Sequence, residues 1–256
     1  MSANLRFTIA DRIATITIDR SEKLNAMTPE MAAALVAAIS ECNRSDAVRA
    51  VIVTGAGEKA FSAGSDITTL DDYATPWDFR NRQDYCDALR ACRKPVVAAV
   101  NGYALGGGLE TAMACDIRIA STNARFAAPE IKLGWIGGGG MAVGLAHSIG
   151  MSNAALMLYT GDMVGAEQAL AWGLVSEVMP PGQLMMRAQA IAAAIADRAP
   201  IAAETAKLNL RAAHQMPYDK AIEYERDLQA ICFATADAIE GRAAFAERRT
   251  PDFRRR

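Results

Sequence analysis

The sequence is poor in histidine and cysteine and lacks the common hydrolytic motifs. It has two histidines, His147 and His214, and five cysteines without a Cys-x-x-Cys pair, which argues against a zinc site and a disulfide framework. No His-Glu-x-x-His, Gly-x-Ser-x-Gly or P-loop motif occurs in it. We therefore expect no zinc, common serine or P-loop chemistry. We expect the histidines to be structural or exposed and the cysteines to be buried thiols.

A large net charge and an unbroken apolar run are also missing. The formal net charge of the 256 residues is −2, so we expect no nucleic-acid partner. Asn101, Glu110 and many glycines break the longest apolar stretches, so we expect no membrane span. The N-terminus lacks the apolar run of a signal peptide, which makes the cytoplasm the expected location. The arginines within residues 248–256 could form a solvated tail or contact phosphate, and the pattern alone favours the tail.

The pattern of apolar residues changes near residue 180. Strands and helices alternate before it, whereas the rest reads as helix with breaks at Pro200 and Pro217. We predict an α/β body over residues 1–180 and a helical region over residues 181–256. Within the body we predict a hairpin over residues 5–19, a helix after Thr28-Pro29, strands over residues 48–54, 96–100, 116–120, 124–127 and 174–179, and helices over residues 75–92, 137–149 and 165–172.

Residues 96–116 form the most informative stretch. An apolar run and a turn at Asn101-Gly102 precede three glycines that lead into a helix carrying Glu110. Backbone N–H groups at a helix start have no partner within the helix and attract a negatively charged oxygen. If Gly107 donates its N–H, Glu110 rises from the same face of the first turn. The stretch therefore predicts an oxyanion donor beside a carboxylate, or else a glycine run that packs on a strand.

Residues 61–67, Phe-Ser-Ala-Gly-Ser-Asp-Ile, form a second informative stretch. Its small residues leave backbone N–H groups uncovered, as an oxyanion hole requires. Taken alone, Asp66 is better explained as a cap of the following segment. The preceding residues 55–60 imitate a dinucleotide-binding fingerprint. We reject that interpretation because a second glycine turn stands where the helix should begin.

Taken together, residues 61–67, 101–110, 115–116 and 126–134 resemble the crotonase superfamily and are most similar to enoyl-CoA hydratases. The resemblance runs nearly end to end, from Lys23-Leu-Asn-Ala26 to residues 240–249. It implies an α/β fold, a spiral of ββα units, with a helical C-terminal region that forms trimers, often paired into hexamers. It also implies an acyl-CoA thioester substrate with no metal and no separate cofactor, since CoA is part of the substrate.

The resemblance assigns roles residue by residue. It implies that the backbone N–H groups of Ser65 and Gly107 form the oxyanion hole, and that Glu110 and Glu130 are the catalytic carboxylates. It implies contacts with the substrate or its CoA at Lys23, Ala26, Ala63, Ser65, Asp66, Ile67, Thr68, Tyr103, Leu105 and Trp135, and from a neighbouring subunit at Phe245 and Arg248. With Arg248 assigned to phosphate, residues 254–256 are left as the solvated part of the tail.

The implied reaction is reversible hydration of 2-enoyl-CoA thioesters through a stabilised enolate. Glu130 would donate and accept the proton, while Glu110 would orient the water and share the base role. An enoyl-CoA isomerase usually needs one acid, so the pair favours hydration. A carnitinyl-CoA dehydratase would keep both acids and remains an alternative. A low-turnover relative that binds CoA thioesters or RNA should have lost one of them.

Two features depart from common hydratases. Residues 136–143, Ile-Gly-Gly-Gly-Gly-Met-Ala-Val, replace a proline, a glycine pair and Thr-Gln-Arg-Leu, and Trp135 replaces a smaller apolar residue. Both follow Glu130, where the acyl group is expected, so the acyl chain length and the reaction itself stay open. Trp135 is equally well explained as core filling.

Overall fold

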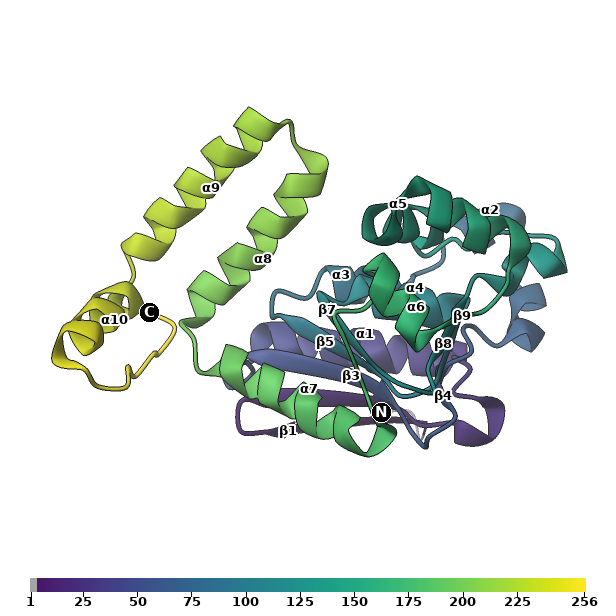
Figure 1. Cartoon of the computed structure of the whole chain (residues 1–256), viewed down its shortest axis with the longest axis horizontal. Coiled ribbons are helices and arrows are strands. Elements are labelled where there is room, and N and C mark those ends of the chain that lie inside the picture. The colour runs from purple at the N-terminus through teal and green to yellow at the C-terminus, as the bar shows by residue number, and fades with distance from the viewer. Residues whose placement is uncertain (1–3) are drawn as a thin grey trace.

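The structure is a computed structural model that describes residues 4–256, except for the side chains of residues 70–72. Within that part the strands form two sheets (Figure 1). The larger sheet has the order β1 (Leu5–Ala10), β2 (Ile13–Ile18), β3 (Ala50–Gly55), β5 (Val96–Val100), β7 (Ile117–Ser121) and β10 (Glu177–Met179). The smaller sheet has the order β4 (Ala60–Ser62), β6 (Tyr103–Leu105), β8 (Arg125–Ala127) and β9 (Val164–Gly165).

From β3 to β8, consecutive strands alternate between the two sheets. β3, β5 and β7 are parallel neighbours in the larger sheet. The strand that follows each of them, β4, β6 or β8, is a parallel neighbour in the smaller sheet. Parallel strands need long crossover connections, and helical segments supply them here. This repetition confirms the predicted spiral of ββα units.

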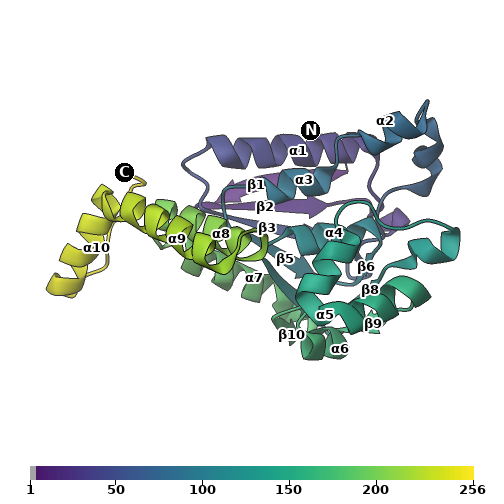
Figure 2. The same cartoon turned by 90° about the horizontal axis from the view of Figure 1, so that it is seen from above.

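Helices cover both faces of the larger sheet (Figure 2). Alternate residues of a strand point to opposite faces, and β3 shows this, with Val51 and Val53 in one apolar core and Ala50 and Ile52 in the other. The first core contains residues of α1 (Pro29–Arg44), α3 (Tyr85–Arg90), α4 (Gly107–Ala114), α5 (Met141–Thr160) and α6 (Ala166–Trp172). The second core contains residues of α7 (Pro181–Ala196).

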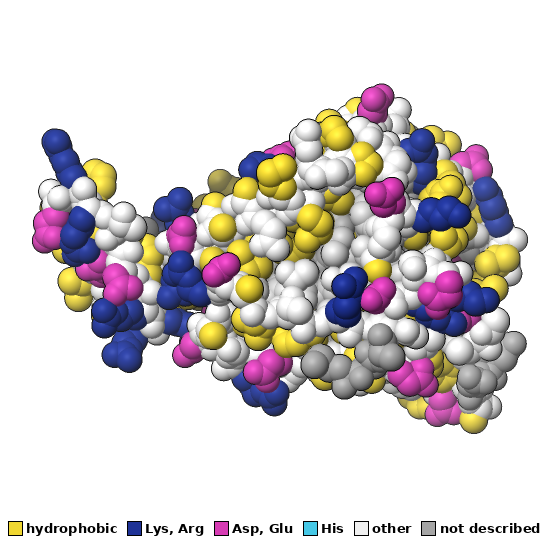
Figure 3. Space-filling model, turned by 90° about the horizontal axis from the view of Figure 1, so that it is seen from below, with side chains coloured by type: hydrophobic (Ala, Val, Ile, Leu, Met, Phe, Trp, Pro, Cys, Tyr) yellow, Lys and Arg dark blue, Asp and Glu magenta, His cyan; other side chains and the backbone are white. Residues whose placement is uncertain are grey.

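The last three helices project from this body as an arm, residues 200–247 (Figures 1 and 2). They are α8 (Pro200–Gln215), α9 (Tyr218–Phe233) and α10 (Ala236–Glu247). At the base of the arm, buried Lys207 lies 2.7 Å from Asp116 and donates to the Lys94 carbonyl at 3.0 Å. Figure 3 shows Lys and Arg side chains interspersed with Asp and Glu side chains on both the arm and the body. The predicted helical region thus contains α7 on the sheet and three helices away from it.

Most predicted elements are found, and the differences have local causes. Thr28 caps α1 by accepting a hydrogen bond from the Met31 N–H, as predicted. The single helix predicted over residues 75–92 is wrong, because Asp84 caps a new helix, α3, and residues 81–84 separate it from α2 (Pro76–Arg80). The sequence analysis also missed β4 and β6, which are only three residues long. Three short 3-10 helices complete the chain at η1 (Ser21–Lys23), η2 (Ile67–Asp72) and η3 (Pro129–Leu133).

The expectation of a solvated tail at residues 254–256 is confirmed for the side chains of Arg254 and Arg256, which are exposed, but it is wrong for Arg255 and for the backbone of the segment. The backbone N–H groups of Arg254 and Arg255 donate to the Asp237 carboxylate at 2.7 and 2.8 Å. The Arg255 guanidinium forms ion pairs with Glu204 and Asp46. A run of like charge can dock in this way because its partners come from elements far apart in the sequence.

One helix, α5, is long and apolar enough to cross a membrane by length and composition alone. A membrane-spanning helix needs about 20 residues of continuous helix. Gly150 interrupts α5 with φ 75° and ψ 161°, so the helix consists of two shorter segments at a kink. The absence of a membrane partner stays a prediction.

Candidate active site

The site residues follow three neighbouring strands of the smaller sheet. β4, β6 and β8 are parallel, so their carboxyl ends meet at one edge of the sheet. Ser65 follows β4, Gly107 and Glu110 follow β6, and Glu130 follows β8. Sheets with parallel strands present functional groups at this edge. The topology therefore brings together four residues, of which the first and the last, Ser65 and Glu130, lie 65 positions apart in the sequence.

The backbone nitrogens of Ser65 and Gly107 lie close together. A Cβ on Gly64 would stand 2.8 Å from the Gly107 nitrogen, and a Cβ on Gly107 would stand 3.3 Å from the Ser65 nitrogen. Gly64 has φ +96°, a conformation that glycine adopts without strain. Glycine is thus required for this approach of the two loops.

Neither of these two N–H groups has an acceptor among the described residues. Met27 pairs with this loop through its N–H to the Gly64 carbonyl and its carbonyl to the Asp66 N–H, which leaves the Ser65 N–H unused. Gly107 is the first residue of α4, where a helical N–H lacks an intrahelical partner. The two groups are free to donate to one external oxygen.

Glu110 is buried and its carboxylate is held by backbone. Its Oε1 accepts hydrogen bonds from the N–H groups of Gly139 and Met141, at 2.7 and 3.2 Å. A Cβ on Gly137 would stand 2.8 Å from Oε1, and a Cβ on Gly139 would stand 2.7 Å from Oε2. The glycine run at residues 137–140 therefore lies directly against this carboxylate.

Glu130 lies beside Gly106, the residue before Gly107. A Cβ on Gly106 would stand 2.8 Å from the Glu130 Oε1 atom. Within the described residues the buried Oε2 atom has no hydrogen-bond partner. Leaving a buried polar atom unpaired costs about 1–3 kcal/mol, and such atoms in native structures often mark functional sites. Glu130 thus has free acceptor capacity at a buried oxygen, whereas both hydrogen bonds to Glu110 go to its Oε1 atom.

Both carboxyl groups are disposed to hold a proton. Burial raises the pKa of Glu110 above its ordinary value, and the charges of Glu130 and Asp84 raise it further against the two backbone hydrogen bonds. Burial also raises the pKa of Glu130. Raised carboxyl pKa values suit groups that exchange protons near neutral pH.

A cavity of about 300 Å³ opens at this edge of the sheet. Its lining includes Met27, Val36, Ser65, Arg82, Tyr85 and Glu110. Glu130 does not contribute to that lining and stands next to it against Gly106. The cavity has both apolar and charged walls, so it can take an apolar group beside the Glu110 carboxylate.

The structure also places the other predicted contact residues of the body. Ala63 donates its N–H to the Leu24 carbonyl, so the loop with Lys23 and Ala26 lies beside the loop that begins at Ala63. Thr68 follows in η2, where Ile67 is 57% exposed. Tyr103 and Leu105 are the outer residues of β6. The loops predicted to bind CoA therefore do meet around Ser65.

Asp66 has a clear local role. It caps η2 by accepting from the Thr68 N–H and forms an ion pair with Arg20 at 2.7 Å. The Arg20 hydrogen bond, aided by Thr68, lowers the pKa of Asp66 to about 2. The interpretation of Asp66 as a cap is confirmed, and its contact with substrate stays a prediction.

Trp135, Phe245 and Arg248 require separate comment. Trp135 is 42% exposed, so it does not fill the core. Phe245 is 87% exposed on α10, and Arg248 ends that helix in a left-handed conformation. Figure 1 shows α10 at the far end of the molecule from β4. The chain's own arm therefore does not bring these two residues to the site.

The sequence analysis missed Tyr85 and Asp84. A Cβ on Gly107 would stand 2.6 Å from the Tyr85 hydroxyl, which lies 3.4 Å from the Ser65 hydroxyl. Burial raises the pKa of Tyr85, which stays protonated. Asp84 lines the same cavity. An acid directly before an apolar turn is a helix-cap signal that could have located Asp84 and the start of α3.

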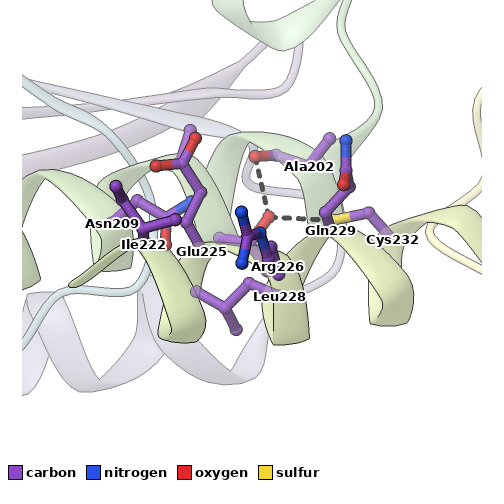
Figure 4. A pocket seen from close by; sticks show the side chains of 10 residues that line it. Ala202, Asn209, Ile222, Glu225, Arg226, Leu228, Gln229 and Cys232 are labelled. Carbon is purple, nitrogen blue, oxygen red and sulfur yellow. Dashed lines mark hydrogen bonds between the residues drawn. The ribbon is translucent and has the colours of Figure 1, made fainter. Parts of the chain in front are cut away.

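A second cavity, of about 430 Å³, lies between α8 and α9 (Figure 4). Its walls include Asn209, Glu225, Arg226 and Cys232, and the Thr205 hydroxyl lies 2.9 Å from the Cys232 sulfur. It lacks paired backbone donors of the kind found at Ser65 and Gly107. The residues predicted from the sequence to carry the chemistry lie at the sheet edge and not in this cavity. The two histidines, His147 and His214, are exposed, and their rings stack with centroids 4.7 Å apart. This agrees with the expectation that they are structural or exposed.

Comparison with known proteins agrees with this geometry. Residues 8–256 match the family model described as enoyl-CoA hydratase/isomerase. The chain is 39% identical to the short-chain-enoyl-CoA hydratase of Clostridium acetobutylicum, over 93% of this chain and 92% of that protein. It is 37% identical to the (E)-benzylidenesuccinyl-CoA hydratase of Thauera aromatica, over 96% and 97%. The crystal structure of an enoyl-CoA hydratase from Bacillus anthracis superimposes with a TM-score of 0.91 at 32% identity, over 99% and 100%.

The chain therefore belongs to the enoyl-CoA hydratase/isomerase family, the crotonase superfamily. Within that superfamily its relatives place it beside the enoyl-CoA hydratases, which are lyases.

Proposed function

We propose that this chain catalyses the reversible syn-hydration of 2-enoyl-CoA thioesters to 3-hydroxyacyl-CoA. The observation that carries the proposal is the pair of unpartnered N–H groups, of Ser65 and Gly107, next to two glutamates with raised pKa values. This addition of water requires hydrogen-bond donors for the thioester oxygen and groups that exchange protons with the water and the α-carbon.

The two N–H groups would bind the thioester carbonyl oxygen. Addition of water at the β-carbon transfers negative charge onto that oxygen as the enolate forms. Donors that are already in place stabilise this charge without reorganisation, and each is worth about 3 kcal/mol in comparable sites. Gly107 adds the positive end of the α4 dipole, since it is the first residue of that helix.

The two carboxylates would divide the proton transfers. Glu130 has a buried oxygen with free acceptor capacity, which suits the group that takes a proton from water and delivers one to the α-carbon. Glu110, held by two backbone donors, would orient the water and share the base role. The charge of Glu130 raises the pKa of Glu110, so we expect the ionisation of one carboxyl group to affect the other.

We further propose that the working form is a homotrimer in which arms bind neighbouring bodies, with trimers pairing into hexamers. Large apolar side chains on the arm are exposed, among them Leu210, Tyr218, Phe233 and Phe245. Exposed apolar patches of this kind mark interaction surfaces. A neighbouring arm would supply Phe245 and Arg248 to the CoA, since the chain's own arm points away from its site. Light scattering after gel filtration gives the mass that tests this assembly.

Purified protein mixed with crotonyl-CoA provides the main test. The enoyl absorbance should fall as water adds, and the product should be 3-hydroxybutyryl-CoA. Glu130→Gln should lower kcat by roughly a hundredfold to ten-thousandfold, the usual contribution of general acid–base groups. Glu167→Gln, at an exposed position of α6, is the matched control and should keep full activity. An active Glu130→Gln would rule out the assignment, and shifted double bonds in place of the hydroxy product would indicate the isomerase.

A further inference from the structure

The Glu110 carboxylate is held by backbone that belongs to a run of four glycines, residues 137–140. Glycine has more conformational freedom than any other residue, so a run of four loses more entropy when it is fixed. Yet Gly139 must present its N–H to the Glu110 carboxylate at 2.7 Å. Some other group must therefore define the conformation of this loop.

Arg90 contacts the loop on its other side. Its Nη1 donates to the Gly139 carbonyl at 2.8 Å, and a Cβ on Gly140 would stand 3.0 Å from the same nitrogen. Its Nη2 pairs with Asp87, one turn earlier on α3, at 2.6 Å. Apart from Glu110, Arg90 is the one side chain of the described residues that hydrogen-bonds to residues 137–140. Gly139 is thus held between a guanidinium and a carboxylate.

We propose that Arg90 is a positioning residue that fixes the Glu110 carboxylate through Gly139. It touches neither the substrate nor the reacting atoms, and it orders the backbone whose N–H binds Glu110. The inference rests on the proposed function only where turnover is the readout. The sequence could not reveal it, because residues 90 and 139 lie 49 positions apart.

The loss of Arg90 should raise the pKa of Glu110. The Gly139 N–H stabilises the ionised carboxylate, and a loosened loop weakens that hydrogen bond. The other charged and titratable groups that face Glu110 are Glu130 from η3, Asp84 at the start of α3, Arg82 before it, and the protonated Tyr85 and Cys86 of α3. A substitution at Arg90 leaves all these groups in place, and its direct charge effect among them is on the Cys86 thiol, whose pKa Arg90 lowers.

The decisive experiment titrates Glu110 directly, with no substrate. Carboxyl carbon-13 NMR of glutamate-labelled protein, with the Glu110 signal assigned from Glu110→Gln, gives its pKa in the parent and in Arg90→Met. Methionine keeps most of the aliphatic stem and removes every donor. We expect the midpoint of the Glu110 titration to move up by about half a pH unit or more.

Arg82→Met is the matched charge control. Arg82 is also a cation beside the loop, since its Nη2 atom would stand 3.5 Å from a Cβ on Gly138, but it makes no hydrogen bond to the loop. Arg82→Met should therefore shift the pKa of Glu110 less than Arg90→Met does.

Turnover provides the second readout. With crotonyl-CoA, Arg90→Met should lower kcat about tenfold or more, move the acidic limb of the pH profile upward, and change KM little. Arg44→Met, which removes an equivalent (i,i+3) pair with Glu41 on α1, should match the parent. An unmoved Glu110 midpoint, or an equal shift in Arg82→Met, would overturn the proposal. An inactive parent with a shifted Glu110 midpoint would overturn the proposed function and leave this one standing.

Discussion

At the edge of the smaller sheet, glycine backbone packs against other backbone and against carboxylates, whereas on the arm large apolar side chains face solvent. The Gly64 and Gly107 contacts leave no room for a methyl group. On α10, by contrast, Phe245 is 87% exposed. The two N–H groups and the two glutamates at the edge come from one chain, and the sheet holds the backbone that places them. The arm has apolar surface in excess of what its own chain covers, which is why we assign its function to an assembly.

The largest effect is expected where the two regions join. Lys207→Met should lower the free energy of unfolding by about 3–5 kcal/mol, because it leaves the Asp116 charge at the base of the arm without its buried partner. Lys220→Met, on the same arm, removes an exposed pair with Glu223 and should cost less than about 1 kcal/mol. Urea unfolding of both variants measures the difference. Equal stabilities would mean that the arm is not anchored through Lys207.

Gly64→Ala tests whether the edge depends on bare backbone. The new methyl group would stand 2.8 Å from the Gly107 nitrogen, so the two N–H groups must separate. We expect kcat with crotonyl-CoA to fall by roughly a hundredfold to a thousandfold, as when one oxyanion donor is lost. Gly150→Ala is the control, since that glycine also has positive φ but nothing within 4 Å of its missing Cβ. A comparable loss in both variants would attribute the effect to backbone strain alone.

Arg248→Ala tests the role proposed for the arm. If a neighbouring arm binds CoA phosphate, KM for crotonyl-CoA should rise about tenfold with kcat nearly unchanged, since one charge-assisted hydrogen bond is worth roughly 1.5–3 kcal/mol. Arg242→Ala, on the same helix, removes a cation that stacks on Phe233 and serves as the control. A rising salt concentration should weaken the parent more than Arg248→Ala. An unchanged KM would place the phosphate elsewhere.

The smallest effect concerns the stability of the edge itself. Burial raises the pKa of Glu130 in the folded state, so this group stabilises the fold below its unfolded pKa near 4.5 and loses that contribution as the pH rises through the folded value. Glu130→Gln does not titrate and should therefore be more stable than the parent at pH 8. The difference should shrink toward pH 5 in urea unfolding curves. A constant difference would show that ionisation of Glu130 is not its cause.

Local patterns determined much of what the chain forms. Thr28-Pro29 specified a helix start through a cap and a fixed φ, and the apolar run at residues 96–100 specified a buried strand. Such signals are local because capping, strand propensity and glycine turns act within a few residues. The ββα spiral and the roles expected of Ser65, Gly107, Glu110 and Glu130 came instead from the resemblance of several ordered motifs to the crotonase superfamily.

Only the tertiary structure decided which groups meet. Three-residue strands such as β4 and β6 have too little sequence to show a period, and they form because neighbouring strands supply their hydrogen bonds. The docking of Arg255, the place of Tyr85 and the contact of Arg90 with Gly139 all join residues far apart in the chain. Contacts of this kind depend on the path of the whole chain, which no single segment encodes.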